Sequence, residues 1–353
     1  MNYREILNPT KSAYRHLQDD ESCFLYEKRS MWALTGDDRF VNDIIDSVFD
    51  RKAADEMMAR AKEVSDRLYI RGAGNEYHTI KKYYPDIEFC AFVDRDPVKI
   101  SMGTIDGHKV ISPDEFYEGN RDRYIIVNSS AFSEEIAREL KDHGVPEDHI
   151  FNFGNLSRST EQYFEPGIIK PIEHEIFVDG GCYDGTTFRN FVKWCNGNYD
   201  AIFSFEPDRQ NYEVTSGSLE KDPVANVNLF NKGLWDKDET LYFNASGTQG
   251  SGIVDGQNSG SSTVSIETTS IDKALNGAPA TFIKLDVEGA EYEALIGAEE
   301  TIKKHHPRMA ISIYHKPEDI FTLPELVLSF SDEYRLYLRH YQLSRFETIL
   351  YAI

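Results

Sequence analysis

The pattern of apolar and polar positions divides the chain into a helical start and two stretches of alternating strands and helices. Up to about residue 65, apolar residues recur at helical spacing, as at Met57, Met58 and Ala61. From Arg67 onward the chain changes to apolar runs of strand length, and most are followed by an amphipathic stretch. The pattern therefore predicts helices over 1–65 and repeated strand–helix units after them.

The strand-like runs fall into two groups, separated by a loop and the prolines Pro166 and Pro171. The first group predicts strands over 68–70, 87–93 and 124–128. The second group predicts strands over 175–179, 201–206, 226–230, 240–243, 263–266, 281–287, 309–314, 334–341 and 346–353. The last two are joined by only four residues, which permits an antiparallel hairpin but no parallel crossover. We expect α/β domains over 66–160 and 161–353, the second with a mostly parallel sheet and an antiparallel terminal hairpin.

One segment between these runs is too rich in small residues to be regular structure. Residues 246–262 hold five glycines and five serines among 17 positions. Such a composition predicts a loop. The sequence leaves open whether it closes over a substrate or is merely slack.

Composition and charge exclude several classes of protein. The chain has 353 residues, with 38 basic and 60 acidic side chains and a formal net charge of −22. This charge repels nucleic acid and anionic lipid surfaces. No run is long and apolar enough to span a membrane, and the first twenty residues lack a signal-peptide core. The four cysteines form no C-x-x-C pair, which predicts reduced thiols, a cytoplasmic location and no bound metal.

Candidate binding residues follow the first two strands of the second domain. After residues 175–178 the sequence reads Asp179-Gly180-Gly181-Cys182-Tyr183-Asp184-Gly185, and Glu206-Pro207 follows the next strand, 27 residues beyond Asp179. Glycines let backbone approach a ligand closely, and the helix that follows offers free N–H groups to a carboxylate. An acid at position 206 can accept hydrogen bonds from both hydroxyls of a ribose. Together these positions predict an adenosine-containing ligand.

Two such ligands compete, a dinucleotide and S-adenosylmethionine. The pyrophosphate of a dinucleotide would be repelled by Asp179 and Asp184 at the turn, whereas S-adenosylmethionine carries an ammonium and a sulfonium. The acids therefore favour S-adenosylmethionine as the cofactor. We predict that it contacts the turn and the acid after the next strand, through Asp179, Gly180, Gly181, Tyr183, Gly185, Glu206 and Pro207.

Four motifs resemble the FkbM family of S-adenosylmethionine-dependent methyltransferases. They are IFVDGGCYDGTT at 176–187, SFEPD at 204–208, NKGLW at 231–235 and FIKLDVEGAEYEAL at 282–295. The resemblance implies a class I methyltransferase fold and O-methylation of hydroxyls on sugars, glycans or polyketide-like products. It also places Asp179, Gly181 and Glu206 at the family's cofactor positions. The family's K-x-D-x-E-G-x-E motif corresponds here to Lys284, Asp286, Glu288 and Glu291.

The residues of the last motif can also be interpreted without the family resemblance. Strand alternation puts Lys284 and Asp286 on one face, and Asp286 stands at the carboxyl end of the strand, where the transferred methyl group is expected. His315 follows the next strand at the same edge and is the predicted general base, with Asp286 as the second candidate. We predict Asp286, His315 and Lys284 as catalytic residues. For Glu291 helix capping is a sufficient explanation, and Glu288 stays open.

The first domain presents a weaker signal. Gly72-Ala73-Gly74 follows a strand and Asp94 ends the next one, as in a dinucleotide fingerprint, but Tyr77 occupies the third glycine position. This stretch resembles the small Rossmann-like accessory domains of some sugar-modifying methyltransferases. For the function of the whole chain two alternatives stay open: a nucleotide-sugar oxidoreductase using the Gly72 turn, and a non-catalytic module whose second domain binds S-adenosylmethionine for a partner enzyme.

The sequence therefore predicts an S-adenosylmethionine-dependent O-methyltransferase with a Rossmann-like sheet, a smaller N-terminal Rossmann-like domain and a helical N-terminal segment. The acceptor is expected to be a hydroxyl of a sugar, glycoconjugate or related natural product. Nucleic acid and membrane are not expected as partners. Assembly into a homo-oligomer is left open.

Overall fold

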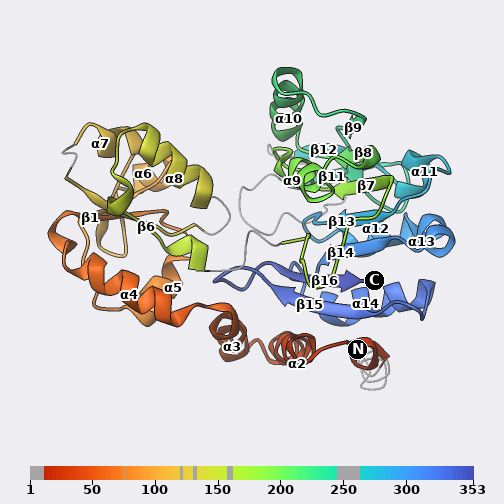
Figure 1. Ribbon diagram of the computed structural model, residues 1–353, viewed down its shortest axis with the longest axis horizontal. Coiled ribbons are helices and arrows are strands. Elements are labelled where there is room, and N and C mark those ends of the chain that lie inside the picture. The colour runs from red at the N-terminus through yellow and green to blue at the C-terminus, as the bar shows by residue number, and fades with distance from the viewer. Residues whose placement is uncertain (1–11, 75, 120–121, 130–132, 157–161, 245–262) are drawn as a thin grey trace. The chain divides into compact units, whose positions relative to one another are not determined.

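The computed structural model describes residues 12–74, 76–119, 122–129, 133–156, 162–244 and 263–353 (Figure 1). The predicted loop over 246–262 lies outside these residues. None of the helices in the described ranges is both long enough and apolar enough to cross a membrane.

The chain forms two compact units, which are considered separately. Unit 1 comprises Met1–Gly36, Tyr163–Arg339 and Thr348–Ile353, and unit 2 comprises Asp37–Gln162 and His340–Glu347. Helix α2 (Asp20–Thr35) thus belongs to unit 1, whereas the next six helices, α3 to α8, belong to unit 2. The domain boundaries at 65 and 160 stay a prediction.

Unit 2 is a six-stranded sheet with helices around it. The strand order is β3-β4-β2-β1-β5-β6, parallel except for the β3–β4 pair. Its strands are β1 (Leu68–Arg71), β2 (Ala91–Val93), β3 (Thr104–Ile105), β4 (His108–Ile111), β5 (Tyr124–Val127) and β6 (Ile150–Asn152). Its helices are α3 (Arg39–Val48), α4 (Arg51–Lys62), α5 (Tyr77–Tyr83), α6 (Pro97–Met102), α7 (Pro113–Tyr117) and α8 (Ser133–Asp142).

The core of unit 2 explains why these short strands are stable. Val93, Ile125 and Val127 from the sheet pack against Phe116 of α7 and Leu140 of α8. Burying each such side chain contributes about 1.5 to 3 kcal/mol. The predicted helices are confirmed over the described residues 12–65, and so are the strands predicted near 68, 90 and 125. Strands β4 and β6 were not predicted from the sequence, because each holds only two adjacent apolar residues and shows no period.

Unit 1 is built on a seven-stranded sheet of order β15-β16-β14-β13-β7-β8-β9. The five strands from β14 to β9 are parallel, and β16 runs antiparallel to β14. These strands are β7 (Glu175–Gly180), β8 (Tyr199–Phe205), β9 (Val227–Phe230), β13 (Phe282–Leu285), β14 (Arg308–Ser312), β15 (Leu336–His340) and β16 (Thr348–Ala352). The predicted mostly parallel sheet with an antiparallel terminal hairpin is confirmed.

Helices and a second small sheet complete unit 1. The small sheet has the order β10-β12-β11. Its strands are β10 (Gly233–Leu234), β11 (Thr240–Asn244) and β12 (Thr263–Thr269). The helices are α9 (Thr186–Trp194), α10 (Arg209–Lys221), α11 (Ile271–Leu275), α12 (Glu291–Ile296), α13 (Glu299–His305) and α14 (Asp319–Phe330).

Helix α2 is fastened to the terminal hairpin by buried polar contacts. Arg29 is 2% exposed and donates hydrogen bonds to the hydroxyl of Thr348, and the hydroxyl of Ser22 accepts one from the backbone N–H of Leu338. Arg339 pairs with Asp19 at 2.7 Å. The start of the chain therefore contributes to the edge of the main sheet of unit 1.

The order of the main sheet determines where a ligand binds. From β7 the chain moves outward through β8 and β9, and it then returns to the other side of β7 with β13 and β14. In open parallel sheets the ligand lies beyond the carboxyl ends of the strands at this change of direction. The residues that follow β7, β8, β13 and β14 are therefore those that build the site.

Candidate active site

The turn after β7 requires its glycines. Gly181 has a left-handed backbone, with φ 78°, and a Cβ atom there would lie 1.9 Å from the carbonyl oxygen of Asp286. At Gly180 a Cβ atom would lie 2.8 Å from a side-chain carbon of Leu234, and at Gly185, with φ 83°, it would meet Phe188 at 2.6 Å. The turn thus lies directly against the end of β13, and larger residues would push the two apart.

Glu206, directly after β8, holds the turn through its carboxylate. One oxygen accepts a hydrogen bond from the backbone N–H of Tyr183 at 2.9 Å, and the other accepts one from the N–H of Asp208 at 2.9 Å. Burial raises the pKa of Glu206, and these two hydrogen bonds oppose the rise. Each oxygen keeps a second lone pair, so the carboxylate can still accept from ribose hydroxyls.

Tyr183 and Pro207 stand beside this carboxylate in the structure. Tyr183 has a left-handed backbone, with φ 50°, and its ring is 52% exposed. Its carbonyl accepts a hydrogen bond from the hydroxyl of Thr215, which ties the turn to α10. Asn231, in the NKGLW motif, donates to the carbonyl oxygens of Glu206 and Pro207 and so fixes the end of β8.

Lys284 and Asp179 form a buried ion pair between β13 and β7. The ammonium lies 3.3 Å from Oδ1 of Asp179 and donates to the carbonyl oxygens of Gly180 and Gly181 at 2.9 and 2.6 Å. Burial would lower the pKa of Lys284, but the carboxylates of Asp179 and Asp286 raise it, so the ammonium stays charged. These contacts support the glycine turn from beneath. The catalytic role expected for Lys284 stays a prediction, as does cofactor contact by Asp179.

Asp286 stands at the end of β13 between two tyrosine hydroxyls. Tyr163 donates to one carboxylate oxygen at 2.8 Å and Tyr314 donates to the other at 2.9 Å. Burial would raise the pKa of Asp286, but Lys284, His315 and the Tyr163 hydroxyl lower it. Asp286 is therefore a fixed negative charge at the edge of the sheet and a weak proton acceptor. Neither tyrosine was singled out from the sequence, and Tyr163 lies 123 positions upstream with no local signal.

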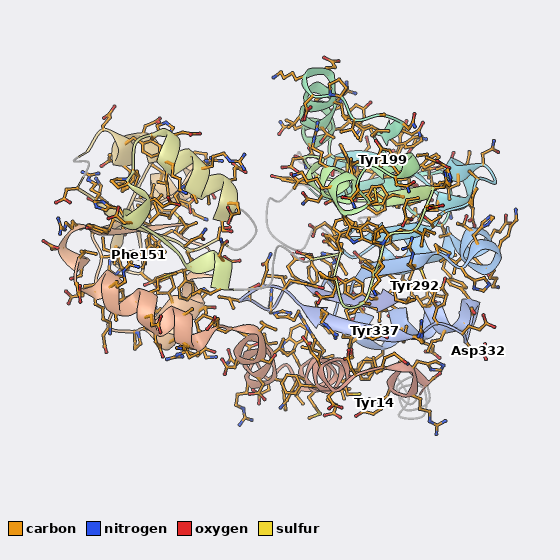
Figure 2. All side chains as sticks on the ribbon, in the orientation of Figure 1. Tyr14, Phe151, Tyr199, Tyr292, Asp332 and Tyr337 are labelled. Atoms are coloured by element: carbon orange, nitrogen blue, oxygen red, sulfur yellow. The ribbon has the colours of Figure 1, made fainter. Side chains whose placement is uncertain are left out.

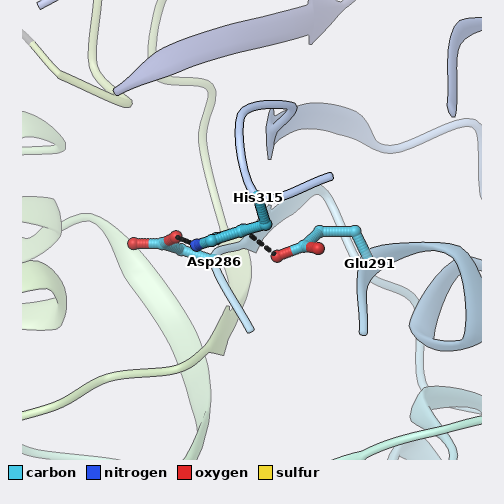
Figure 3. A group of neighbouring side chains, drawn as sticks. All are labelled: Asp286, Glu291 and His315. Atoms are coloured by element: carbon cyan, nitrogen blue, oxygen red, sulfur yellow. Dashed lines mark ion pairs between the residues drawn. The ribbon is translucent and has the colours of Figure 1, made fainter. Parts of the chain in front are cut away.

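His315, just after β14, lies between the carboxylates of Asp286 and Glu291 (Figure 3), and the carboxylate of Glu288 is a third neighbour. Its Nδ1 is 3.0 Å from Glu291, and its Nε2 is 3.6 Å from Asp286 and 3.5 Å from Glu288. Burial would lower the pKa of His315, but Glu291, Asp286 and Glu288 together raise it to about 9. The structure therefore brings the predicted base to the same edge as Asp286, in its protonated form at neutral pH.

Glu291 makes contacts beyond the helix capping that its sequence position predicts. The side chain is 1% exposed, and Oε1 accepts a hydrogen bond from the backbone N–H of Val287 at 2.8 Å as well as facing His315. Glu288 differs, since its side chain is 92% exposed and its backbone is left-handed, with φ 55°. The spacing within the K-x-D-x-E-G-x-E motif was the signal for both.

Asp286, Glu291 and His315 form a candidate cation site. Asp286, Glu291 and His315 offer ligand atoms within 4.8 Å of one another. However, Glu291 faces Nδ1 and Asp286 faces Nε2, so the two carboxylates contact opposite sides of the ring. A histidine binds a metal through one nitrogen, so it cannot share one ion with both carboxylates. The arrangement suits an imidazolium better than a metal.

The Gly72 turn of unit 2 is arranged differently. Asp94 accepts hydrogen bonds from the backbone N–H of Ala73 and from Lys99 at 2.9 and 3.0 Å, so its carboxylate is anchored to the turn much as Glu206 is. Tyr77 is 7% exposed, and its ring packs against Phe92. A core tyrosine therefore fills the position where a dinucleotide fingerprint has a glycine for close packing. The packing of Tyr77 therefore argues against the oxidoreductase alternative.

A seven-stranded sheet of this order, with a glycine turn after β7 and acids after β8 and β13, defines a class I S-adenosylmethionine-dependent methyltransferase. Residues 179–343 match the family model described as Methyltransferase FkbM domain, and residues 64–151 match one described as C2185-like, N-terminal. The chain is therefore a methyltransferase with S-adenosylmethionine as its cofactor, and its residues 179–343 are similar to the FkbM methyltransferase domain.

Solved structures are similar in fold. The crystal structure of Methyltransferase FkbM from Methylobacillus flagellatus KT is 21% identical, with a TM-score of 0.50, and the match covers 92% of this chain and 99% of that one. An rRNA methylase from Streptococcus thermophilus is 15% identical, with a TM-score of 0.34 over 53% of this chain and 88% of that one. Fibrillarin from Aeropyrum pernix, with natively bound S-adenosyl-L-methionine, is 9% identical, with a TM-score of 0.33 over 51% and 67%. No curated protein matches the chain.

Proposed function

We propose that this chain transfers a methyl group to a hydroxyl oxygen of a sugar, a glycoconjugate or a related natural product. The observation that carries the proposal is the group formed by His315, Asp286 and Glu288 at the edge of the sheet, next to the glycine turn. A hydroxyl must lose its proton as the new bond to carbon forms, so its methylation benefits from a base beside the methyl donor. The cluster supplies such groups.

The residues present fit S-adenosylmethionine, which supplies an activated methyl group on a sulfonium. We assign Glu206 to the ribose hydroxyls, because its carboxylate is anchored by two backbone N–H groups and keeps free lone pairs. The turn gives close backbone approach, because its glycines leave no room for Cβ atoms. The proposed cofactor contacts are Asp179, Gly180, Gly181, Tyr183, Gly185, Glu206, Pro207 and Asp286.

For the transfer itself we assign His315 as the base, Asp286 as the charge that lines the methyl group, and Lys284 as a support. Holding the acceptor hydroxyl in line with the donor provides much of the acceleration in such displacements. Lys284 contributes by fixing the carbonyls of Gly180 and Gly181, and therefore the shape of the turn.

Two features of the outer edge favour a polyhydroxylated acceptor. The carboxylate of Glu288 is 92% exposed beside His315, so it is free to accept hydrogen bonds from hydroxyls. Tyr292 follows Glu291 at the start of α12 and is 42% exposed (Figure 2). We propose that this exposed ring adds an apolar surface for a sugar ring, whose hydroxyls the carboxylate of Glu288 binds.

We further propose that the protein works in the cytoplasm, with a small-molecule or glycan acceptor. The thiols of Cys23, Cys90, Cys182 and Cys195 are all free in the structure, which favours a reducing compartment. The net charge of −22 opposes binding to nucleic acid and to anionic membranes. The proposed division is a helical segment over 1–65, a Rossmann-like accessory domain over 66–160 and the methyltransferase domain over 161–353, with a homo-oligomer left open.

Calorimetric titration with S-adenosylhomocysteine tests the cofactor assignment, and a panel of nucleotide sugars and glycans with radiolabelled methyl donor tests the acceptor class. We expect one binding site per chain and label incorporated into a hydroxyl-bearing acceptor. Failure to bind S-adenosylhomocysteine would overturn the site. Binding with label incorporated only into amines or thiols would overturn the acceptor class.

A further inference from the structure

His315 is held at both ring nitrogens by negative charge. Glu291 faces Nδ1, whereas Asp286 and Glu288 face Nε2. A neutral imidazole carries one N–H donor and one acceptor nitrogen, so it would direct a lone pair at one of these carboxylates. Only the imidazolium offers a proton to both sides. The geometry therefore favours a charged ring in the free protein, consistent with the raised pKa of about 9.

This arrangement conflicts with the role of a base, because a protonated imidazole cannot accept a proton. Asp286 does not replace it, because Lys284, His315 and the Tyr163 hydroxyl hold the pKa of Asp286 below its usual value. Glu291 is buried beneath the ring and faces away from Nε2. An event in the catalytic cycle must therefore discharge His315 before it can act.

The charges around the ring point to that event. The carboxyl groups facing it come from the loop after β13 (Asp286 and Glu288), from α12 (Glu291) and from α14 (Asp319). The cations nearby are Lys284, paired with Asp179, and Lys316, whose backbone N–H donates to Asp319. Because these four carboxyl groups outnumber the two lysines, the site attracts a further positive charge. When that charge binds, it favours loss of the proton from His315. In an effective dielectric of about 20, a unit charge about 6 Å away lowers a neighbouring pKa by about 2.

This inference rests on the proposed function. We propose that His315 releases its proton when the cationic methyl donor binds, and that it regains a proton from the acceptor hydroxyl during transfer. The O–H bond of the acceptor breaks as its O–CH₃ bond forms, and the proton passes to Nε2 of His315. The S–CH₃ bond breaks with its electron pair left on sulfur. The positive charge thus moves from sulfur to imidazole, and the cluster keeps the same net charge before and after transfer.

Glu291 determines which nitrogen becomes the base. Because its carboxylate faces Nδ1 and is fixed by the N–H of Val287, the neutral ring keeps its remaining proton on Nδ1. The lone pair then appears on Nε2, on the side of Asp286 and Glu288. Glu291 is therefore a positioning residue for His315, as the buried acid is in other acid–histidine pairs.

Measuring how many protons are released when a ligand binds tests this proposal without an acceptor substrate. Calorimetric titrations of the full chain at pH 7.5, in phosphate and in Tris, give the number of protons released from the difference in apparent enthalpy. We expect about 0.7 proton released with S-adenosylmethionine, and the same with the amine analogue sinefungin, because lowering the pKa of His315 from about 9 by about 2 leaves the ring about one-quarter protonated at this pH. S-adenosylhomocysteine has the same amino acid and ribose but no sulfonium charge, and it should release close to none.

Variants identify the group that titrates. His315→Gln should bind S-adenosylmethionine with no proton released, whereas His305→Gln, on α13 and outside the cluster, should behave as wild type. Histidine NMR signals of the wild type, assigned with His315→Gln, should show a lower pKa for His315 with sinefungin than with S-adenosylhomocysteine. Equal proton release with charged and neutral ligands, or release that survives in His315→Gln, would overturn the proposal. Absence of binding by all three ligands would instead overturn the proposed function, and this inference with it.

Discussion

The ammonium of Lys284 lies 3.3 Å from Oδ1 of Asp179, and the two side chains are 1% and 0% exposed. Lys284→Met removes the cation and leaves a carboxylate buried in the central strands with no compensating charge. We expect the free energy of unfolding to fall by about 3 to 5 kcal/mol, measured by urea denaturation.

A double variant separates charge from packing at this pair. Lys284→Met combined with Asp179→Asn leaves no uncompensated charge, so it should recover most of the stability that the single variant loses. If the double variant were as unstable as the single one, the lost contacts to the carbonyls of Gly180 and Gly181 would be the cause instead.

Gly181→Ala tests the close contact between the turn and β13. Its Cβ atom would lie 1.9 Å from the carbonyl oxygen of Asp286, and the strand would have to move. Gly197→Ala is the matched control, because Gly197 has a similar φ of 73° but nothing within 4 Å. We expect Gly197→Ala to cost about 1 kcal/mol of stability and Gly181→Ala at least about 2 kcal/mol more, by denaturant unfolding. Similar losses in the two variants would contradict the contact.

Glu206→Ala removes the proposed acceptor for the ribose hydroxyls. A hydrogen bond to a charged group contributes about 1.5 to 3 kcal/mol, so affinity for S-adenosylhomocysteine should fall about 10- to 150-fold. Glu220→Ala makes the same change at an exposed position near the end of α10 and should leave the affinity as it is. Wild-type affinity in Glu206→Ala, measured by calorimetry, would remove this residue from the site.

The raised pKa of His315 makes stability depend on pH. Its pKa rises from 6.5 to about 9 in the folded protein, so protonation favours folding. The contribution is fully present below about pH 6.5 and is lost as the pH rises through about 9. We expect the stability difference between wild type and His315→Gln to shrink by about 3 kcal/mol from pH 6 to pH 10. A difference that stays constant over this range would show that His315 is not held as a cation.

Much of the fold was predictable because it is encoded between near neighbours. Apolar runs gave most strands of the two larger sheets, and the four-residue link between the last two runs gave the antiparallel hairpin. The glycines at 180, 181 and 185 predicted a tight turn, because few other residues tolerate the left-handed backbone that such turns require. Strands β4 and β6 escaped prediction since they are too short to show a period, and they depend on pairing with β2 and β5.

The sequence by itself determined which chemistry-bearing residues end up at one edge of the main sheet of unit 1. Asp179, Glu206, Asp286 and His315 each follow a strand, and parallel strands bring their ends together. Only the tertiary structure decided what each of them does there. It supplied Tyr163 and Tyr314 to Asp286, and it brought Glu291 under His315. The charge state of a side chain depends on burial and on every charge around it, and residues far apart in the sequence provide both.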